Sequence, residues 1–466
     1  MCLSTRASRS PFQKQENEIR KIAFSPFPRP APADMLSPMN RRHALRALAG
    51  APFVLRAQPK RPPNVVLFLA DDLGSADLGF RGAKDLRTPH IDRLAAEGVH
   101  FTQAYSNGPV CSPTRCALLT GQYQQRHGVD GVIYVGERTR GLSPDALLLP
   151  EVLKTRGYTS GLFGKWHLGY PKENFPTRQG FDEFIGHLAG NIDYFHHVDR
   201  QLNPDLWNRE QLFKDPRYFT DLIAAEAASF VDRHRQRPFF LYVPFNAPHD
   251  PFQGPGDRPE KPFGEKRDRK TYASMIESMD TAVGRVMERI RAHNLDRDTA
   301  VFFLSDNGGV PAVASNAPFR GHKGSLWEGG IRTPLLARMP GAFPAGSAHS
   351  MPCAGMDLFA TAAELAGASL PAGHRLDSVS LVPACRGGQA PPRESLFFHN
   401  QAPKQGPQRA LLQNGWKYRR EATGEDRLYH LAQDQSETRD LASTEPQRLQ
   451  QLRATYEAWL RDVMPA

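Results

Sequence analysis

Apolar residues follow two alternating patterns along the chain. Short unbroken apolar runs that end in polar residues are typical of strands buried on both faces of a parallel sheet. Such runs lie within residues 64–72, 99–106, 158–169, 238–250 and 299–309. Between them, apolar residues recur at helical spacing in residues 88–98, 114–121, 147–157, 220–235 and 272–290. This alternation of strand and helix predicts a doubly wound α/β sheet.

One helix carries clear signals at both ends. In TPHIDRLAAEG, Thr88 is expected to cap the helix, Pro89 to lie in its first turn and Gly98 to end it.

The character of the chain changes after Gly373. Short β-like segments at 394–400, 409–421 and 426–434 precede a helical pattern at 445–463, with the weakly apolar GGQAPPR before them. We therefore expect three parts: a leader over 1–58, a main α/β domain over 59–390, and a smaller domain over 391–466. The smaller domain is expected to contain an antiparallel sheet and one helix.

Polar residues occur where the predicted strands of the main domain end. They are Asp71 and Asp72, Lys165 and His167, His249, and Asp306 and Asn307. Ligands of open α/β sheets bind outside the carboxyl ends of the strands. These residues therefore predict one shared site.

Charge at first suggests a nucleic-acid partner, because the net charge is +10 and the sequence pI is about 9.4. However, residues 1–60 hold 11 Lys/Arg and 3 Asp/Glu, which leaves 48 basic and 46 acidic residues for the rest. A long basic groove in the body is therefore not expected. No segment approaches the ~18–20 unbroken apolar residues that a membrane span needs.

The basic leader has a pattern of its own. Residues 39–58, MNRRHALRALAGAPFVLRAQ, pair Arg41 with Arg42 and resemble a twin-arginine export signal, with cleavage expected after Ala57. A basic N-terminus without a signal is the alternative. Export predicts a periplasmic or secreted protein. Residues 1–38 resemble neither a signal nor a domain, so Met35 or Met39 is a plausible start.

Five cysteines, an odd number, do not predict a disulfide framework.

The acids at the strand ends offer only oxygen ligands. Asp71, Asp72, Asp306 and Asn307 would suit Ca²⁺ or Mg²⁺ rather than zinc. Each acid alone could simply cap a helix or open a turn, and Asp-Asn-Gly is a common turn sequence. Two such clusters in one predicted crevice favour a metal.

Positive and imidazole side chains come from separated segments. Arg115, Lys165, His167, His249 and Lys323, gathered near a metal, would form a pocket for a tetrahedral oxyanion. A lone His or Lys is usually better explained as a solvated surface residue. The segment GKWHLG weakens this explanation, because Lys165 and His167 are two residues apart at the end of a strand and could face the same way.

Cys111 begins the stretch CSPTRCALLTG, just before a predicted helix. A helix N-terminus favours negative charge, so a thiol there is expected to be acidified, as in a Cys–His hydrolase. A metal, several cations and a nucleophile together suit the transfer of a sulfuryl or phosphoryl group better.

The segment CSPTR resembles the C-x-P-x-R signature of type I sulfatases. Further blocks are similar to those of the family and stand in its order: LFLADDLG, TPHIDRLAAEGVHFTQAY, TGQY, GKWHLG, NAPHDP, SDNGG and GHKGSLWEGGIRTP. The resemblance covers about residues 62–466. SNAPFRGHKG leans toward the branch of arylsulfatase A and N-acetylgalactosamine-6-sulfatase.

The resemblance implies an alkaline-phosphatase-like doubly wound mixed sheet and a sulfuric ester hydrolase. It implies that a formylglycine-generating enzyme oxidises Cys111 to Cα-formylglycine, whose hydrate attacks sulfur. It implies a calcium ion held by the oxygen ligands above and by modified Cys111. Arg115 would hold the hydrate, His167 would sit beside it, and Lys165, His249 and Lys323 would hold the sulfate ester.

Other functions remain open from the sequence. A phosphonate monoesterase or phosphodiesterase would use the same scaffold, and a carbohydrate-binding relative would have lost the chemistry. Sulfated saccharides are the expected substrates and aryl sulfates the alternative. The segments GNIDYFHHVDR (190–200) and PFQGPGDRPEKPFGEKRDRK (251–270) either line the mouth of the pocket or are solvated loops.

Overall fold

The computed structural model describes residues 61–389, 393–402 and 406–464. The predictions about the leader and its cleavage site lie outside these residues, and the predicted boundary near residue 390 falls in a gap between them. Residues 61–466 group as one compact unit. No helix among the described residues is long and apolar enough to cross a membrane.

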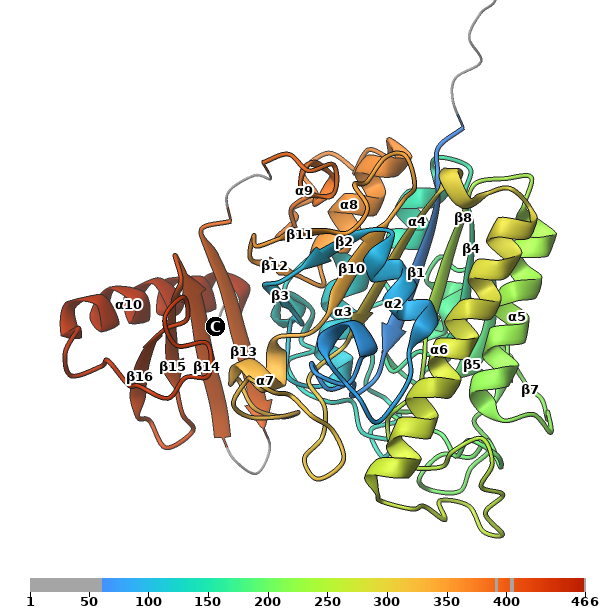
Figure 1. The fold of residues 1–466 in the computed structure, drawn as a ribbon, viewed down its shortest axis with the longest axis horizontal. Helices are drawn as coiled ribbons and strands as arrows, with labels where there is room; N and C mark the ends of the chain where they lie inside the picture. Colours follow the sequence, from blue (N-terminus) through green and yellow to red (C-terminus); the bar gives the residue numbers. More distant parts are fainter. Residues whose placement is uncertain (1–60, 390–392, 403–405, 465–466) are drawn as a thin grey trace, which may run out of the picture. The chain divides into compact units, whose positions relative to one another are not determined.

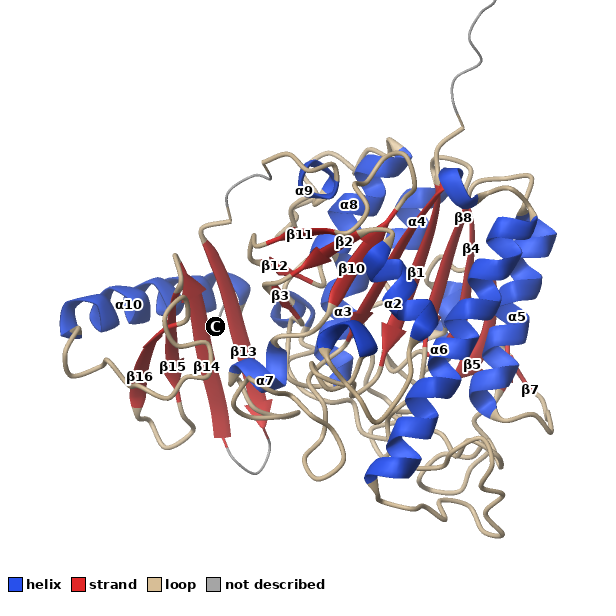
Figure 2. Ribbon diagram, viewed as in Figure 1, coloured by secondary structure: helices blue, strands red, loops and turns tan. Residues whose placement is uncertain are grey.

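A ten-stranded sheet forms the centre of the main part, in the order β11-β2-β10-β9-β1-β8-β4-β5-β6-β7 (Figures 1 and 2). Its strands are β1 (Asn64–Ala70), β2 (Val99–Phe101), β4 (Thr159–Lys165), β5 (Glu183–His187), β6 (Trp207–Asn208), β7 (Gln211–Leu212), β8 (Phe239–Pro244), β9 (Thr299–Ser305), β10 (Leu335–Arg338) and β11 (Ser347–His349). The central strands β9, β1, β8, β4 and β5 are all parallel, whereas β10 is antiparallel to β9 and to β2. The predicted doubly wound sheet is therefore confirmed, as a mixed sheet.

Helices cover both faces of this sheet (Figure 1). In β1, Val66 and Phe68 join a core with α2 (Pro89–Ala96), α5 (Phe219–His234) and α6 (Arg269–Ala292). Val65 and Leu67 alternate to the other face, whose core includes α3 (Cys111–Thr120), α4 (Leu149–Lys154), α8 (Asp357–Ala366) and α9 (Val382–Cys385). Burial on both faces explains the unbroken apolar runs of the central strands.

Two local predictions need correction. Residues 99–106 form two short strands rather than one, because β3 (Ala104–Tyr105) leaves the main sheet to pair with β12 (Cys353–Ala354). Thr88 occupies the N-cap position of α2, but its hydroxyl makes no capping hydrogen bond. Instead, the Asp280 carboxylate on α6 accepts from the backbone N–H groups of His90 and Ile91. A distant helix therefore supplies the cap.

A second, four-stranded antiparallel sheet lies in the C-terminal part, as predicted. It is made of β13 (Ser395–Ala402), β14 (Gly406–Gln413), β15 (Trp416–Arg420) and β16 (Asp426–His430), and it packs with α10 (Pro446–Val463). The same apolar cluster includes Ala117 of α3 and Ile331 of α7 (Glu328–Ile331). The second sheet thus packs against the elements that flank Cys111 and Lys323.

Candidate active site

The acidic residues emerge together because their strands are neighbours. β1 and β9 are parallel, and Ala70 lies opposite Ser305 at their carboxyl ends. Asp71 and Asp306 follow these residues directly. The backbone N–H of Asp72 donates to Oδ1 of Asp306 at 3.3 Å. The register of the sheet therefore brings three buried carboxylates to one place.

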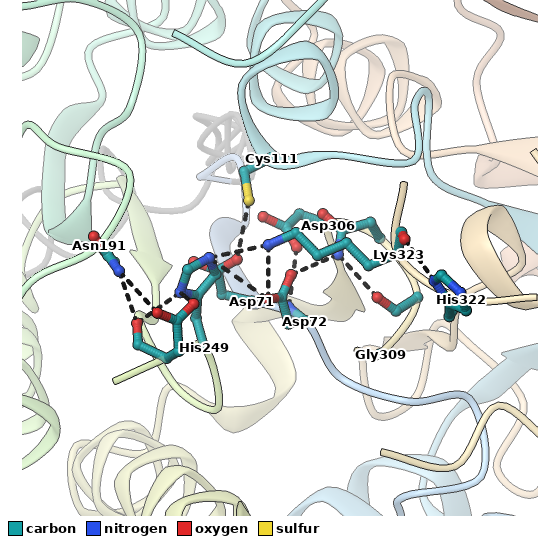
Figure 3. A network of polar contacts seen from close by, with 12 residues as sticks. Asp71, Asp72, Cys111, Asn191, His249, Asp306, Gly309, His322 and Lys323 are labelled. Atoms are coloured by element: carbon teal, nitrogen blue, oxygen red, sulfur yellow. Dashed lines mark hydrogen bonds and ion pairs between the residues drawn. The ribbon is translucent and has the colours of Figure 1, made fainter. Parts of the chain in front are cut away.

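Cys111 is the first residue of α3, and its thiol points at these carboxylates (Figure 3). Its Sγ lies 3.4 Å from Oδ1 of Asp71, and the residue is buried. Burial and the Asp71 carboxylate raise the pKa of the thiol well above its usual range. The expected acidification is therefore wrong for the unmodified cysteine, and the Cys–His hydrolase alternative loses its activated nucleophile.

Three cations neutralise the three carboxylates. Arg115 Nη2 lies 2.9 Å from Oδ2 of Asp306 and 3.4 Å from Oδ2 of Asp71. Lys165 Nζ donates to Oδ2 of Asp71 at 2.5 Å, and Lys323 Nζ donates to Oδ2 of Asp72 at 2.7 Å. Formal charges inside this cluster therefore sum to zero. Any divalent cation added to it would leave a surplus of positive charge for an anion to balance.

His249 and Lys323 form a hydrogen-bonded pair. Lys323 Nζ lies 3.0 Å from Nε2 of His249, and because an ammonium can only donate, Nε2 is the acceptor. The proton of the neutral ring then lies on Nδ1, which donates to the backbone carbonyl of Asp250 at 2.7 Å. Burial and the charge of Lys323 lower the pKa of His249 well below its usual value. Lys323 is therefore the protonated member of the pair.

His167 is buried and has one free ring nitrogen. Its Nε2 lies 3.0 Å from the carbonyl of Ile133, which can only accept, so Nε2 carries the proton. Its Nδ1 is buried without a hydrogen-bond partner among the described residues. Burial, Lys165 and Arg115 lower the pKa of His167 well below its usual value. The ring is thus a neutral imidazole with a lone pair available on Nδ1.

The position of His167 depends on a glycine. A Cβ added at Gly190 would lie 2.8 Å from Nε2 of His167. We expect Gly190→Ala to displace the ring from Ile133 and to lower kcat by about 10- to 100-fold, because displacements near 1 Å cost rates of that order. Gly256→Ala is the matched control, since its Cβ would meet no atom within 4 Å. Steady-state kinetics on an aryl sulfate check both variants. Equal kcat values in the two would contradict the inference that Gly190 leaves the space in which His167 acts.

A hard cation fits the oxygen atoms of the site. Asn307 donates its amide N–H groups to Oδ1 of Asp72, at 2.7 Å, and to the carbonyl of Gly308. Its Oδ1 is left buried without a partner among the described residues. One ligand atom from each of Asp71, Asp72, Cys111 and His249 also lies within 4.8 Å of the others. A carboxylate-rich set with an unpartnered amide oxygen is what Ca²⁺ or Mg²⁺ prefers.

The structure thus gathers all of the residues predicted for the site. Several of their partners were not predicted. Asn191 Nδ2 donates to the carbonyl of Asp250 at 3.1 Å, and Asp250 also pairs with Arg200. Asp250 could have been suspected because it follows His249 at a strand end.

Gln408 of β14 contacts the segment that follows Lys323. No local sequence pattern indicates this contact, because the two segments are far apart in the chain. Its Oε1 accepts from the N–H of Leu326 at 3.2 Å, and its Nε2 donates to the carbonyl of Gly324 at 3.1 Å. The C-terminal sheet therefore contacts the loop that carries Lys323.

Comparison with known proteins identifies the family to which the chain belongs. A family model described as Sulfatase matches residues 63–368. N-acetylgalactosamine-6-sulfatase of Canis lupus familiaris is 35% identical over 378 residues, covering 75% of this chain and 69% of that protein. Arylsulfatase A of Homo sapiens is 37% identical over 370 residues, covering 74% and 71%.

Solved structures agree with the expected alkaline-phosphatase-like fold. Ps i-CgsB in complex with k-i-k-neocarrahexaose has a TM-score of 0.80 at 33% identity, covering 87% of this chain and 94% of that chain. A phosphonate monoester hydrolase of Agrobacterium radiobacter shares the fold, with a TM-score of 0.63 at 21% identity and coverage of 84% and 96%. The chain belongs to the sulfatase family and is a sulfuric ester hydrolase, an enzyme that releases sulfate from sulfate esters.

Proposed function

We propose that this sulfatase acts on sulfated saccharides, through a nucleophile made by oxidation of Cys111 to Cα-formylglycine, with Ca²⁺ bound beside it. The observation that carries the proposal is the position of Cys111. Its Sγ faces Asp71 inside a buried cluster in which cations and carboxylates balance. The aldehyde of formylglycine supplies, once hydrated, two hydroxyl groups on one carbon.

The oxygen atoms of Asp71, Asp72, Asp306 and Asn307 would hold the ion, together with an oxygen of modified Cys111. We favour these ligands over the His249 nitrogen, which already accepts from Lys323. Ca²⁺ contributes positive charge that stabilises oxygen anions. Arg115 contacts Asp71 and Asp306, so it would hold the modified side chain of Cys111 in a fixed position relative to these two acids.

The remaining residues have roles that follow from their contacts. Lys165, His249 and Lys323 would bind the oxygen atoms of the sulfate ester and neutralise charge that develops on them. The Lys323–His249 pair would deliver a proton to the leaving oxygen, because Lys323 is protonated and the two share a hydrogen bond. The free Nδ1 of His167 would accept a proton when sulfate is expelled.

Sulfated saccharides are our substrate class, and aryl sulfates are the alternative. The relative named above was solved with neocarrahexaose, at 33% identity to this chain. Export to the periplasm or the medium, as the twin-arginine pattern of the leader predicts, would bring the enzyme to such substrates.

The decisive experiment is mass spectrometry of the peptide that contains Cys111, after expression together with a formylglycine-generating enzyme. We expect the mass of the aldehyde, about one Ca²⁺ per chain by elemental analysis, and release of sulfate from 4-nitrocatechol sulfate. An unmodified thiol at Cys111 together with no release of sulfate would contradict the proposal. Faster cleavage of a phosphonate monoester than of any sulfate ester would favour the phosphonate alternative.

A further inference from the structure

Three arginines on the loops beside His249 each lie over an aromatic ring. The distances from the guanidinium carbon to the ring centroid are 4.9 Å for Arg200 over Phe263, 5.0 Å for Arg258 over Phe195 and 5.8 Å for Arg267 over Phe252. All three arginines are exposed. An aromatic surface beneath a guanidinium limits its motion and leaves its N–H groups free on the other side.

These loops are connected to the catalytic centre. The Asp250 carboxylate pairs with Arg200 and lies 3.1 Å from Nδ1 of His249. Arg200 is thus separated from the imidazole by a single carboxylate. The Asp193 carboxylate joins the loop of residues 190–200 to the loop of residues 251–270. It accepts from the N–H of Phe263 at 2.6 Å and from Nε2 of Gln253 at 2.8 Å.

The positive charge of this surface is only partly neutralised. Neither Arg258 nor Arg267 forms an ion pair within the described part of the chain, and Arg200 pairs with Asp250 alone. The Glu265 carboxylate also attracts Arg200 electrostatically, and it accepts a hydrogen bond from the N–H of Phe252 at 3.1 Å. Burial lowers the pKa of Arg200, the Glu265 carboxylate opposes this shift, and the like charge of Arg267 adds to it.

We propose that Arg200, Arg258 and Arg267 form a second anionic subsite, which binds a further sulfate group on the same saccharide chain whose ester is cleaved next to His249. This inference rests on the proposed function. A guanidinium presents two parallel N–H donors that match two oxygen atoms of a sulfate, and its charge assists both hydrogen bonds. Arg258 and Arg267 form no ion pair within the described residues, and Asp221 attracts Arg258 only at longer range, so a bound sulfate would not have to displace a paired carboxylate from either group.

The test is calorimetric binding of dextran sulfate oligosaccharides to Cys111→Ala protein, which cannot turn the ligand over. We expect the double variant Arg258→Gln/Arg267→Gln to bind about tenfold more weakly and to show a smaller salt dependence. Inorganic sulfate serves as the probe for the catalytic subsite alone, and its Kd is expected to change much less.

The matched control removes the same charge elsewhere. Arg237 and Arg297 are exposed and lie just before β8 and β9, at the ends of the strands opposite to the site. Arg237→Gln/Arg297→Gln is expected to bind within twofold of the parent. Equal weakening in both double variants, or none in Arg258→Gln/Arg267→Gln, would overturn the subsite. Since binding needs no turnover, this failure is distinct from a failure of the parent enzyme to release sulfate.

Discussion

Cys111→Ser is expected to abolish multiple turnover, with a fall in kcat of at least about 10³-fold, a scale set by other enzymes that lose their nucleophile. A serine hydroxyl could attack sulfur and become sulfated. However, it offers no second hydroxyl on the same carbon to expel sulfate, and water would have to attack sulfur instead. The measurement is release of nitrocatechol from its sulfate, together with the mass of the intact protein after incubation with substrate.

A neighbouring cysteine provides the control. Cys116 lies five residues further along the same helix and is also buried, but its thiol, unlike that of Cys111, forms no hydrogen bond with Asp71, Asp72 or Asp306. Cys116→Ala is expected to keep kcat within about threefold, since a small residue replaces a small residue in the core. Wild-type turnover by Cys111→Ser would show that the chemistry uses another nucleophile, such as water on the metal.

The central strands and the residues at their ends could be predicted from the sequence, because the cause is local and strong. Strands buried on both faces must be continuously apolar, so a polar residue such as Asp71 or Asp306 marks the end of a strand. Parallel strands then bring these ends to one edge of the sheet. This reasoning places Asp71, Lys165, His249 and Asp306 together without the structure.

The partners of these residues were beyond the sequence, because they come from distant segments. No local pattern indicates that Asp280 caps α2, that Gln408 contacts the loop after Lys323, or that Gly190 leaves space for His167. The thiol of Cys111 shows the same limit. Its place at a helix N-terminus favours a thiolate, but its full burial beside Asp71 outweighs that effect.

Lys417→Met is expected to reduce the free energy of unfolding by about 3–5 kcal/mol, the usual cost of removing one partner from a buried ion pair. Lys417 on β15 is fully buried, and its Nζ lies 2.8 Å from Glu328 and 2.9 Å from Glu437. Glu328 retains Arg332, at 3.2 Å, whereas Glu437 would keep no ion pair within 4 Å among the described residues and only the longer-range attraction of Arg419. Urea denaturation measures the difference.

Two further variants separate charge from packing. Lys154→Met removes an exposed lysine that is 3.4 Å from Asp182, and its cost is expected to stay below about 1 kcal/mol. Lys417→Met/Glu437→Gln removes both charges of one pair, so it is expected to recover part of the lost stability. A double variant no more stable than Lys417→Met would indicate that the aliphatic packing of Lys417, rather than its charge, holds the second sheet in place.

The loss of unfolding free energy in Lys417→Met is also expected to depend on pH, and proton linkage determines whether it grows or shrinks as the pH rises. Burial already raises the pKa of Glu437 in the native protein, and loss of the adjacent cation would raise it further. A carboxyl whose folded pKa exceeds its unfolded value of about 4.3 binds more protons when folded, so it destabilises the protein above the folded pKa. The variant should therefore approach wild-type stability as the pH falls from 8 to 5. A deficit that stays constant across this range would contradict this linkage, and it would indicate that lost packing of Lys417, rather than the unpaired Glu437 carboxylate, causes the loss of stability.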